Sequence, residues 1–243
     1  HRLLRNRVRR RGFGAALAII FFDSIIMIYI LSFVFGLIAV FLSYTIANIY
    51  DNLPSIMLVL GGVIVSSVFK ALVSFFKYVA DPQEELPEIV FWLMGSLASA
   101  NYNDILIAII PISIGVIGLM ALRWRINVLS MGDKKAKAMG IKTNLVKMII
   151  IVSTTIATTG AVAVSGTIGW IGLVIPHIGR MIIGNNNKIL IPVSFSLGAF
   201  FLVIIDGFGR VITGSELPLS IITALVGGPF YVYLLKKTKG GGW

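Results

Sequence analysis

Five ionisable side chains lie inside long apolar segments, where they could bind ions, move protons or form ion pairs. Asp206 and Arg210 are four residues apart, so on a helix they share a face and can pair. His177 and Arg180 are three residues apart in a glycine-rich segment, and Lys70 lies in a third segment. Because charge inside an apolar span is costly and usually serves a function, each is a candidate site residue.

Each candidate also has a purely structural interpretation. Asp206 and Arg210 can simply neutralise each other within one helix. His177 and Arg180 can lie at a helix end and extend their side chains to the aqueous interface, which the nearby Lys188 favours. Lys70 must face a cavity, a seam between two copies of the chain or a polar neighbour.

Signatures of enzymatic catalysis are absent from the sequence. There is no cysteine, which excludes thiol nucleophiles, thiolate metal sites and disulfides. The sequence has no HExxH motif, no GxSxG motif and no glycine-rich phosphate loop ending in Lys-Ser/Thr. We predict no catalytic residue, no metal site and no bound cofactor in this chain.

The composition indicates a membrane protein. Of 243 residues, 57% are hydrophobic and only 13% are charged, and the mean hydropathy is +0.95. About 20 apolar residues cross the roughly 30 Å hydrocarbon core of a bilayer as a helix. Six segments meet this length or nearly so: residues 24–47, 55–78, 104–122, 145–164, 189–212 and 217–235.

Two further apolar segments are shorter. Residues 167–184 predict a seventh pass that is broken at Pro176, because proline removes one helical hydrogen bond. Residues 13–22 would form about 15 Å of helix, too little to cross, so the chain is expected to begin inside a helix. Glycines in and beside the broken pass would let helices approach closely; they are Gly166, Gly169, Gly172 and Gly179.

The charges are segregated along the chain. Residues 123–147 hold seven Lys or Arg and one Asp, and three lysines lie near the C-terminus, so both segments should be cytoplasmic. The acidic segment 81–103 is then outside, where residues 89–98 form a short amphipathic stretch with Trp92 as an interfacial anchor. An even number of passes between the two basic segments requires residues 167–184 to cross.

Residues 123–147 also contain a short helix-forming run, residues 133–139, with a glycine at each end. The small residues Ala136, Ala138 and Gly140 beside lysines would let the backbone of another protein approach closely. This pattern predicts a docking element. Composition alone is equally compatible with a solvated loop that only orients the chain.

Five stretches of the sequence resemble motifs of one protein family. Residues 132–140, GDKKAKAMG, look like the coupling loop of binding-protein-dependent ABC importer permeases of the iron-siderophore and cobalamin type, the FecCD family. The other stretches occur in the family's order: LGGVIVSS (60–67), FWLMGSLA (91–98), GTIGWIGLVIPHIGR (166–180) and ELPLSIITALVGGPFYVY (216–233). The resemblance covers residues 12–239.

The resemblance implies an all-α fold, a polytopic transmembrane helix bundle of the ABC importer permease type. The family has ten membrane helices and works as a homodimer, whereas this chain has room for about seven helices and a partial one. We therefore expect a single permease domain at residues 12–239, with 123–147 as its cytoplasmic coupling region, and a tail at 240–243. The six arginines of residues 1–11 are interpreted as a sequence junction and not as a binding surface.

By this resemblance, the chain is expected to be the permease subunit of an ATP-driven importer for a metal chelate such as an iron-siderophore complex, haem or cobalamin. It would lie in the plasma membrane, surrounded by lipid, with its C-terminus in the cytoplasm. Its expected partners are ABC ATPase subunits, which would bind ATP and Mg, an extracytoplasmic substrate-binding protein and a second copy; no nucleic acid is expected. Two other classes are an ion-gradient-driven secondary transporter or channel and an inactive truncated fragment.

The resemblance also assigns roles to residues. Arg210 resembles an outer charge that docks the substrate-binding protein. The predicted ATPase-coupling residues are Gly132, Asp133, Lys134, Ala136, Ala138 and Gly140. The predicted pathway or packing residues are Lys70, Gly166, Gly169, Pro176, His177, Arg180 and Asp206.

Overall fold

The computed structural model describes residues 16–17, 25–47, 55–98, 100–213 and 217–237. The predictions made for residues 1–11, for 240–243 and for most of 13–22 lie outside these described residues.

The described residues form an all-helical bundle, as predicted. Its helices are α2 (Ile25–Ala47), α3 (Ser55–Val79), α4 (Glu85–Leu93), α5 (Tyr102–Leu129), α6 (Asp133–Ala138), α7 (Thr143–Ser165), α8 (Ile171–Ile183), α9 (Asn187–Thr213) and α10 (Leu219–Lys237). Among the described residues, α2, α3, α5, α7 and α9 are long and apolar enough to cross a membrane. The chain is a multi-pass membrane protein.

One of the predicted passes differs from the structure, whereas α10, Leu219–Lys237, agrees with the predicted span 217–235 to within two residues at each end. The predicted break at Pro176 is wrong, because α8 continues through this proline and the helix is interrupted earlier, at residues 166–170. α5, α9 and α10 also contain internal prolines. Packed membrane helices tolerate proline because neighbouring groups compensate for the lost hydrogen bond.

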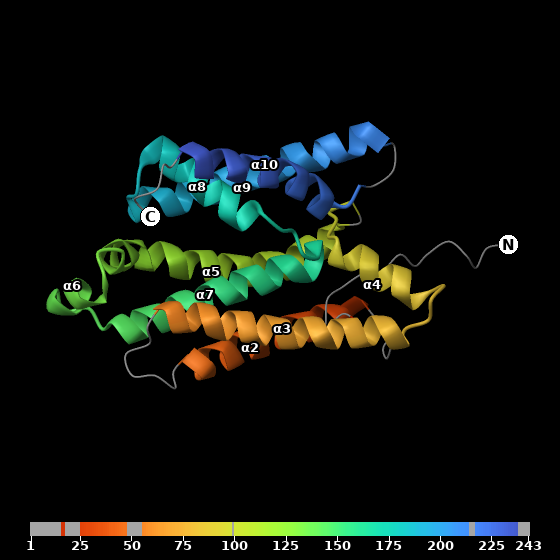
Figure 1. The fold of residues 1–243 in the computed structure, drawn as a ribbon, viewed down its shortest axis with the longest axis horizontal. Helices are drawn as coiled ribbons and strands as arrows, with labels where there is room; N and C mark the ends of the chain where they lie inside the picture. Colours follow the sequence, from red (N-terminus) through yellow and green to blue (C-terminus); the bar gives the residue numbers. More distant parts are fainter. Residues whose placement is uncertain (1–15, 18–24, 48–54, 99, 214–216, 238–243) are drawn as a thin grey trace.

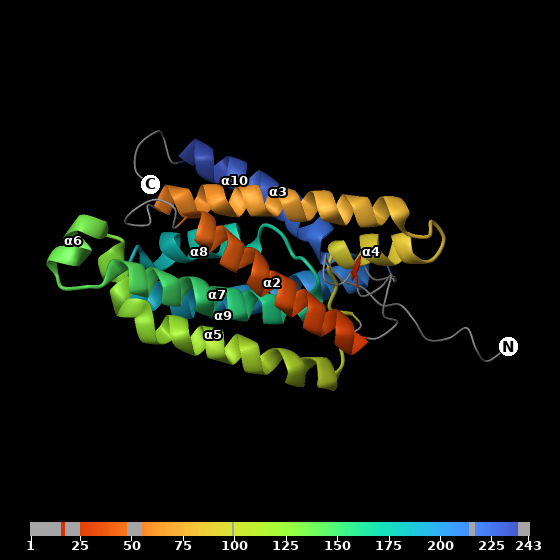
Figure 2. The same ribbon diagram turned by 90° about the horizontal axis from the view of Figure 1, so that it is seen from below.

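The bundle is built around α5 and α7, which make the most extensive contact between any two described helices. α2 packs on α7 and α3 packs on α2, whereas α8, α9 and α10 form a second group that joins the bundle through α9 and α5 (Figure 1). α4 lies at one end of the bundle and α6 projects from the opposite end (Figure 2).

Small residues set the separation of α5 and α7. A Cβ atom on Gly115 of α5 would lie 2.3 Å from the carbonyl oxygen of Ser153 and 2.6 Å from the Cβ of Ala157, both on α7. In the other direction, a Cβ on Gly160 of α7 would lie 2.6 Å from the ring of Pro111. The two backbones therefore pack at the close distance that small residues permit in membrane proteins.

The two ends of the bundle hold different segments. The backbone N–H of Asn187, at the start of α9, donates to the side-chain oxygen of Asn127 at 3.0 Å, so the α8–α9 turn lies at the α6 end. The described end of α10 also lies toward this end (Figure 1). At the opposite end, the N–H of Leu219 donates to the carbonyl of Gly95 after α4. Residues 167–184 therefore run from one end of the bundle to the other. This is required if the two basic segments lie on the same side of the membrane.

Trp92 does not have the predicted position. Its side chain is 2% exposed and packs with Ile28, Leu31 and Val162 inside the bundle. The outward-facing aromatic of α4 is the neighbouring Phe91, which is 51% exposed. A nine-residue helix contains too few turns for its hydrophobic pattern to identify the packed face.

Candidate functional site

α6 is a six-residue helix that extends from the end of the bundle between α5 and α7. Its bounds agree with the predicted helix at residues 133–139. The exposed residues of its surface and of the following turn are Lys134, Lys135, Lys137, Ala138, Met139 and Gly140. This surface carries basic charge around small and apolar side chains, a composition that suits contact with another protein.

Ala136 is not part of that surface. It is 0% exposed, and its carbonyl accepts a hydrogen bond from the N–H of Ile141. We predicted it as a small docking residue, but its small side chain instead lets α6 lie against the rest of the chain. Met139 was not among the predicted coupling residues. It is 55% exposed beside Ala138 and gives the surface an apolar contact group.

Asp133 forms an ion pair at the base of α6. Its Oδ2 atom lies 2.6 Å from the Nζ atom of Lys147 in α7, whose side chain is 10% exposed. Asp133 therefore directs its carboxylate back toward the bundle. The sequence shows Lys147 only as one of several basic residues. Its partner Asp133 is fourteen residues away on another helix, so no local spacing predicts the pair.

Asp206 and Arg210 form the predicted pair within α9. The Nε atom of Arg210 donates to Oδ2 of Asp206 at 2.8 Å. The Arg210 side chain is 55% exposed and the Asp206 side chain is 21% exposed. Arg210 lies near the end of α9 that is distant from α6, so its guanidinium is accessible from that end while the carboxylate holds it.

Gly166 lies at a junction of three chain segments near the α4 end. A Cβ atom on this residue would lie 2.5 Å from the carbonyl oxygen of Trp92 and 2.9 Å from Cα of Gly95. Next to it, the N–H of Ser96 donates to the carbonyl of Ser165, and the hydroxyl of Thr167 donates to the carbonyl of Leu93. Gly169, by contrast, has no described atom within 4 Å of a Cβ position, so it makes no close helix contact there.

His177 and Arg180 belong to the half of α8 near the α6 end. The ring of His177 contacts that of Tyr231 on α10, with centroids 6.4 Å apart. Arg180 is exposed and lines, with Pro176 and Asn187, a cavity of about 310 Å³ between α5, α8 and α9. This position agrees with the interpretation in which Arg180 reaches the aqueous interface.

Lys70 lies on α3, at the side of the bundle that α2 and α3 form. α3 packs chiefly on α2, and Lys70 is exposed together with Ser66 and Ser67. Within the described part of the chain, the Lys70 side chain therefore points away from the bundle. A seam between two copies of the chain or a path for cargo would give the Lys70 charge polar surroundings.

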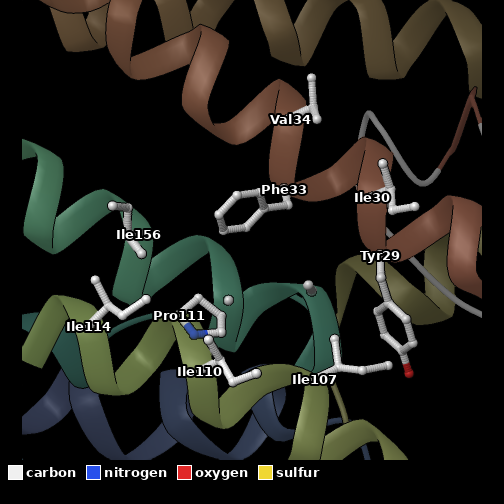
Figure 3. A pocket seen from close by; sticks show the side chains of 11 residues that line it. Tyr29, Ile30, Phe33, Val34, Ile107, Ile110, Pro111, Ile114 and Ile156 are labelled. Carbon is white, nitrogen blue, oxygen red and sulfur yellow. The ribbon is translucent and has the colours of Figure 1, made fainter.

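An apolar groove of about 450 Å³ lies between α2, α5 and α7 (Figure 3). The hydroxyl of Tyr29, on its rim, donates to a carboxylate oxygen of Asp104. The remaining lining is apolar: Ile30, Phe33, Val34, Ile107, Ile110, Pro111, Ile114, Ile156, Gly160 and Ala163. Such a lining offers no ligand set for a free metal ion or an inorganic anion.

Comparison with known proteins identifies the family. The FecCD transport family model matches residues 11–237. The chain is 38% identical over 231 residues to the molybdate import system permease protein MolB of Haemophilus influenzae, and 42% identical over 227 residues to a probable iron chelatin transport system permease protein of Helicobacter pylori. These matches cover 95% and 93% of this chain and 68% of each relative.

A solved structure agrees with this match. It is described as a metal-chelate type ABC transporter in an inward-facing conformation, and it superposes with a TM-score of 0.86 at 38% identity, over 93% of this chain and 72% of the other. The family model and the structural match both extend over nearly all of the sequence. The chain belongs to the FecCD transport family of membrane permeases.

Proposed function

We propose that the chain is the membrane-spanning subunit of an ATP-driven, binding-protein-dependent ABC importer, and that α6 is the element by which ATPase subunits drive it. The observation that carries this proposal is the placement of α6, an exposed basic helix that projects beyond the apolar bundle. ATP and Mg belong to the ATPase subunits. Closure of the two ATPases would move α6 of each copy and so change access to a path between the two copies.

The charges support one orientation of the bundle. The α6 end carries the basic residues of 123–147, and the opposite end carries five acids between residues 81 and 104. Lys and Arg concentrate on the cytoplasmic side of membrane proteins. We therefore propose that α6 and the C-terminus lie in the cytoplasm and that Arg210 lies on the outer side of the plasma membrane.

The proposed cargo is a metal chelate. Three of the similar proteins are named for metal chelates: a cobalamin permease of Halobacterium salinarum, a hemin permease of Yersinia pestis and the iron chelatin permease. The molybdate permease is named for an oxyanion. We propose that two copies enclose the path and that the exposed face of α3 with Lys70 lines it. A positive side chain there would attract anionic chelates.

Adding bulk to the exposed surface of α6 should detach the ATPase. In Ala138→Trp, we expect at least a tenfold loss of ATPase that co-purifies with the protein from its native membranes, since the large ring would prevent close approach of the partner. The matched control is Gln83→Trp, which adds the same side chain to an exposed position between α3 and α4, at the opposite end of the bundle. Equal ATPase retention by the two variants would contradict the docking role.

Reversing the charge of Arg210 should weaken binding of the substrate-binding protein. We expect Arg210→Glu to reduce affinity about tenfold at low salt and less at high salt, because exposed interfacial charges act through screened electrostatics. Titration of the purified binding protein against the permease in nanodiscs measures this. The control is Asp206→Asn, which removes the pair but retains the positive charge. If both variants weaken binding equally, the pair has only its structural role within α9.

A further inference from the structure

α6 is too short to hold its own orientation. A six-residue helix is not stable in isolation, so contacts with the rest of the chain must fix its direction. Some of the fixation is apolar: Ala136 is 0% exposed, and Val146 and Thr143 at the start of α7 are 2% and 3% exposed. The turn between α6 and α7 contains Gly140, which gives the backbone little stiffness of its own.

The second contact is the ion pair between Asp133 and Lys147. It bridges the start of α6 and the first turns of α7, and its two residues are fourteen positions apart. The 2.6 Å distance and the burial of the Lys147 side chain, which is 10% exposed, distinguish it from fully exposed surface pairs, which are weak and easily rearranged. The Asp133 side chain is 39% exposed, so the pair is buried on the side of α7. Removal of a charged partner from a buried ammonium is costly.

α5 and α7, the two helices that flank α6, are both extensively connected to the rest of the bundle. α7 packs along α5 and also along α2. A displacement of α6 that is transmitted to α7 would therefore reach the helices at the centre of the bundle. A displacement absorbed by the turn at Gly140 would not be transmitted to α7.

We infer that Lys147 is a positioning residue for coupling: through Asp133 it locks α6 to α7, so that movement imposed on α6 by the ATPase is transmitted to the membrane helices. This inference rests on the proposed function. It assigns Asp133 to a contact within the chain, whereas the exposed surface around Ala138 makes the contact with the ATPase. Loss of the ion pair should uncouple ATP hydrolysis from transport without releasing the ATPase.

The test compares Asp133→Asn, Lys147→Gln and the charge swap Asp133→Lys/Lys147→Asp in the complex purified with its ATPase and binding protein. The readout is the amount of radiolabelled cargo transported per ATP hydrolysed in proteoliposomes. We expect each single variant to keep the amount of bound ATPase subunit within about twofold of that of the unsubstituted protein. The cargo transported per ATP should fall at least tenfold. The swap should recover transport per ATP to within about threefold of the original.

A spin label on α6 gives a second readout. The sequence contains no cysteine, so Lys135→Cys creates a unique attachment site on an exposed residue. The label should become more mobile in both single variants and return to its original mobility in the swap. Lys147→Arg retains the charge, so it should match the unsubstituted protein in transport per ATP and in label mobility. This variant keeps the test usable if a neutral variant does not fold.

The outcomes separate this inference from the proposed function. If the original complex shows no ATPase association and no ATP-dependent uptake, the proposed function fails. If the original complex transports and the single variants keep their transport per ATP, only the inference is overturned. It is also overturned if the single variants release the ATPase, or if the folded charge swap recovers neither coupling nor label mobility.

Discussion

Replacement of Gly115 by alanine should destabilise the bundle by about 3 kcal/mol, at the upper end of the range for overpacked cores. The added Cβ would lie 2.3 Å from the carbonyl oxygen of Ser153 and 2.6 Å from Cβ of Ala157. Neither neighbour is the flexible end of a side chain, so α5 and α7 must move apart along their contact. Because this is the most extensive helix contact in the described bundle, the loss should also affect transport.

The fraction of unfolded protein during titration with denaturing detergent measures this effect. The matched control is Gly207→Ala in α9, where a Cβ would have no described atom within 4 Å. Alanine is the better helix former by about 1 kcal/mol, so the control should be neutral or slightly stabilised. If Gly115→Ala behaves like Gly207→Ala, the close packing of α5 and α7 is not a determinant of stability.

Replacement of Gly166 by alanine should open the junction between α4, α7 and α10. The backbone of Gly166 has φ 69° and ψ −167°, a region that is essentially limited to glycine and costs other residues about 1–3 kcal/mol. The added Cβ would also lie 2.5 Å from the carbonyl oxygen of Trp92. Strain and steric overlap act together here, so we expect a loss of folded protein large enough to abolish uptake.

Gly184 provides an internal control for this prediction. Its φ of 77° and ψ of −166° are close to those of Gly166, but a Cβ there would have no described atom within 4 Å. Gly184→Ala therefore measures the backbone cost alone. Thermal unfolding of the two variants in detergent should show the larger loss for Gly166→Ala, and equal losses would mean that the contact with Trp92 and Gly95 contributes nothing.

The sequence predicts best those features that depend on local spacing. Asp206 and Arg210 pair as their four-residue separation predicts, and α6 lies within one residue of its predicted bounds. The long apolar segments are also found, although α5 continues seven residues beyond the predicted end at residue 122. Arg123 and Arg125 end the apolar run without ending the helix, because arginine is a good helix former.

The features that the sequence did not predict depend on contacts between distant segments. Ala136 and Trp92 were assigned to exposed surfaces, yet both are buried, since helices of six and nine residues do not show which face packs. The partner of Asp133 lies on another helix, and no local pattern identifies Lys147. The sequence predicts a helix break at Pro176, but Pro176 lies inside α8 and the break begins at Gly166.

We propose that this permease imports cargo only when ATPase subunits act on it. Uptake into proteoliposomes that contain the protein with its ATPase and binding protein tests this proposal, with radiolabelled ferric siderophore, haem, cobalamin and molybdate as cargo. We expect uptake of a metal chelate that requires ATP hydrolysis and the binding protein and that is lost in Ala138→Trp. Uptake by the permease alone, driven by an ion gradient and unaffected by ATP, would contradict it.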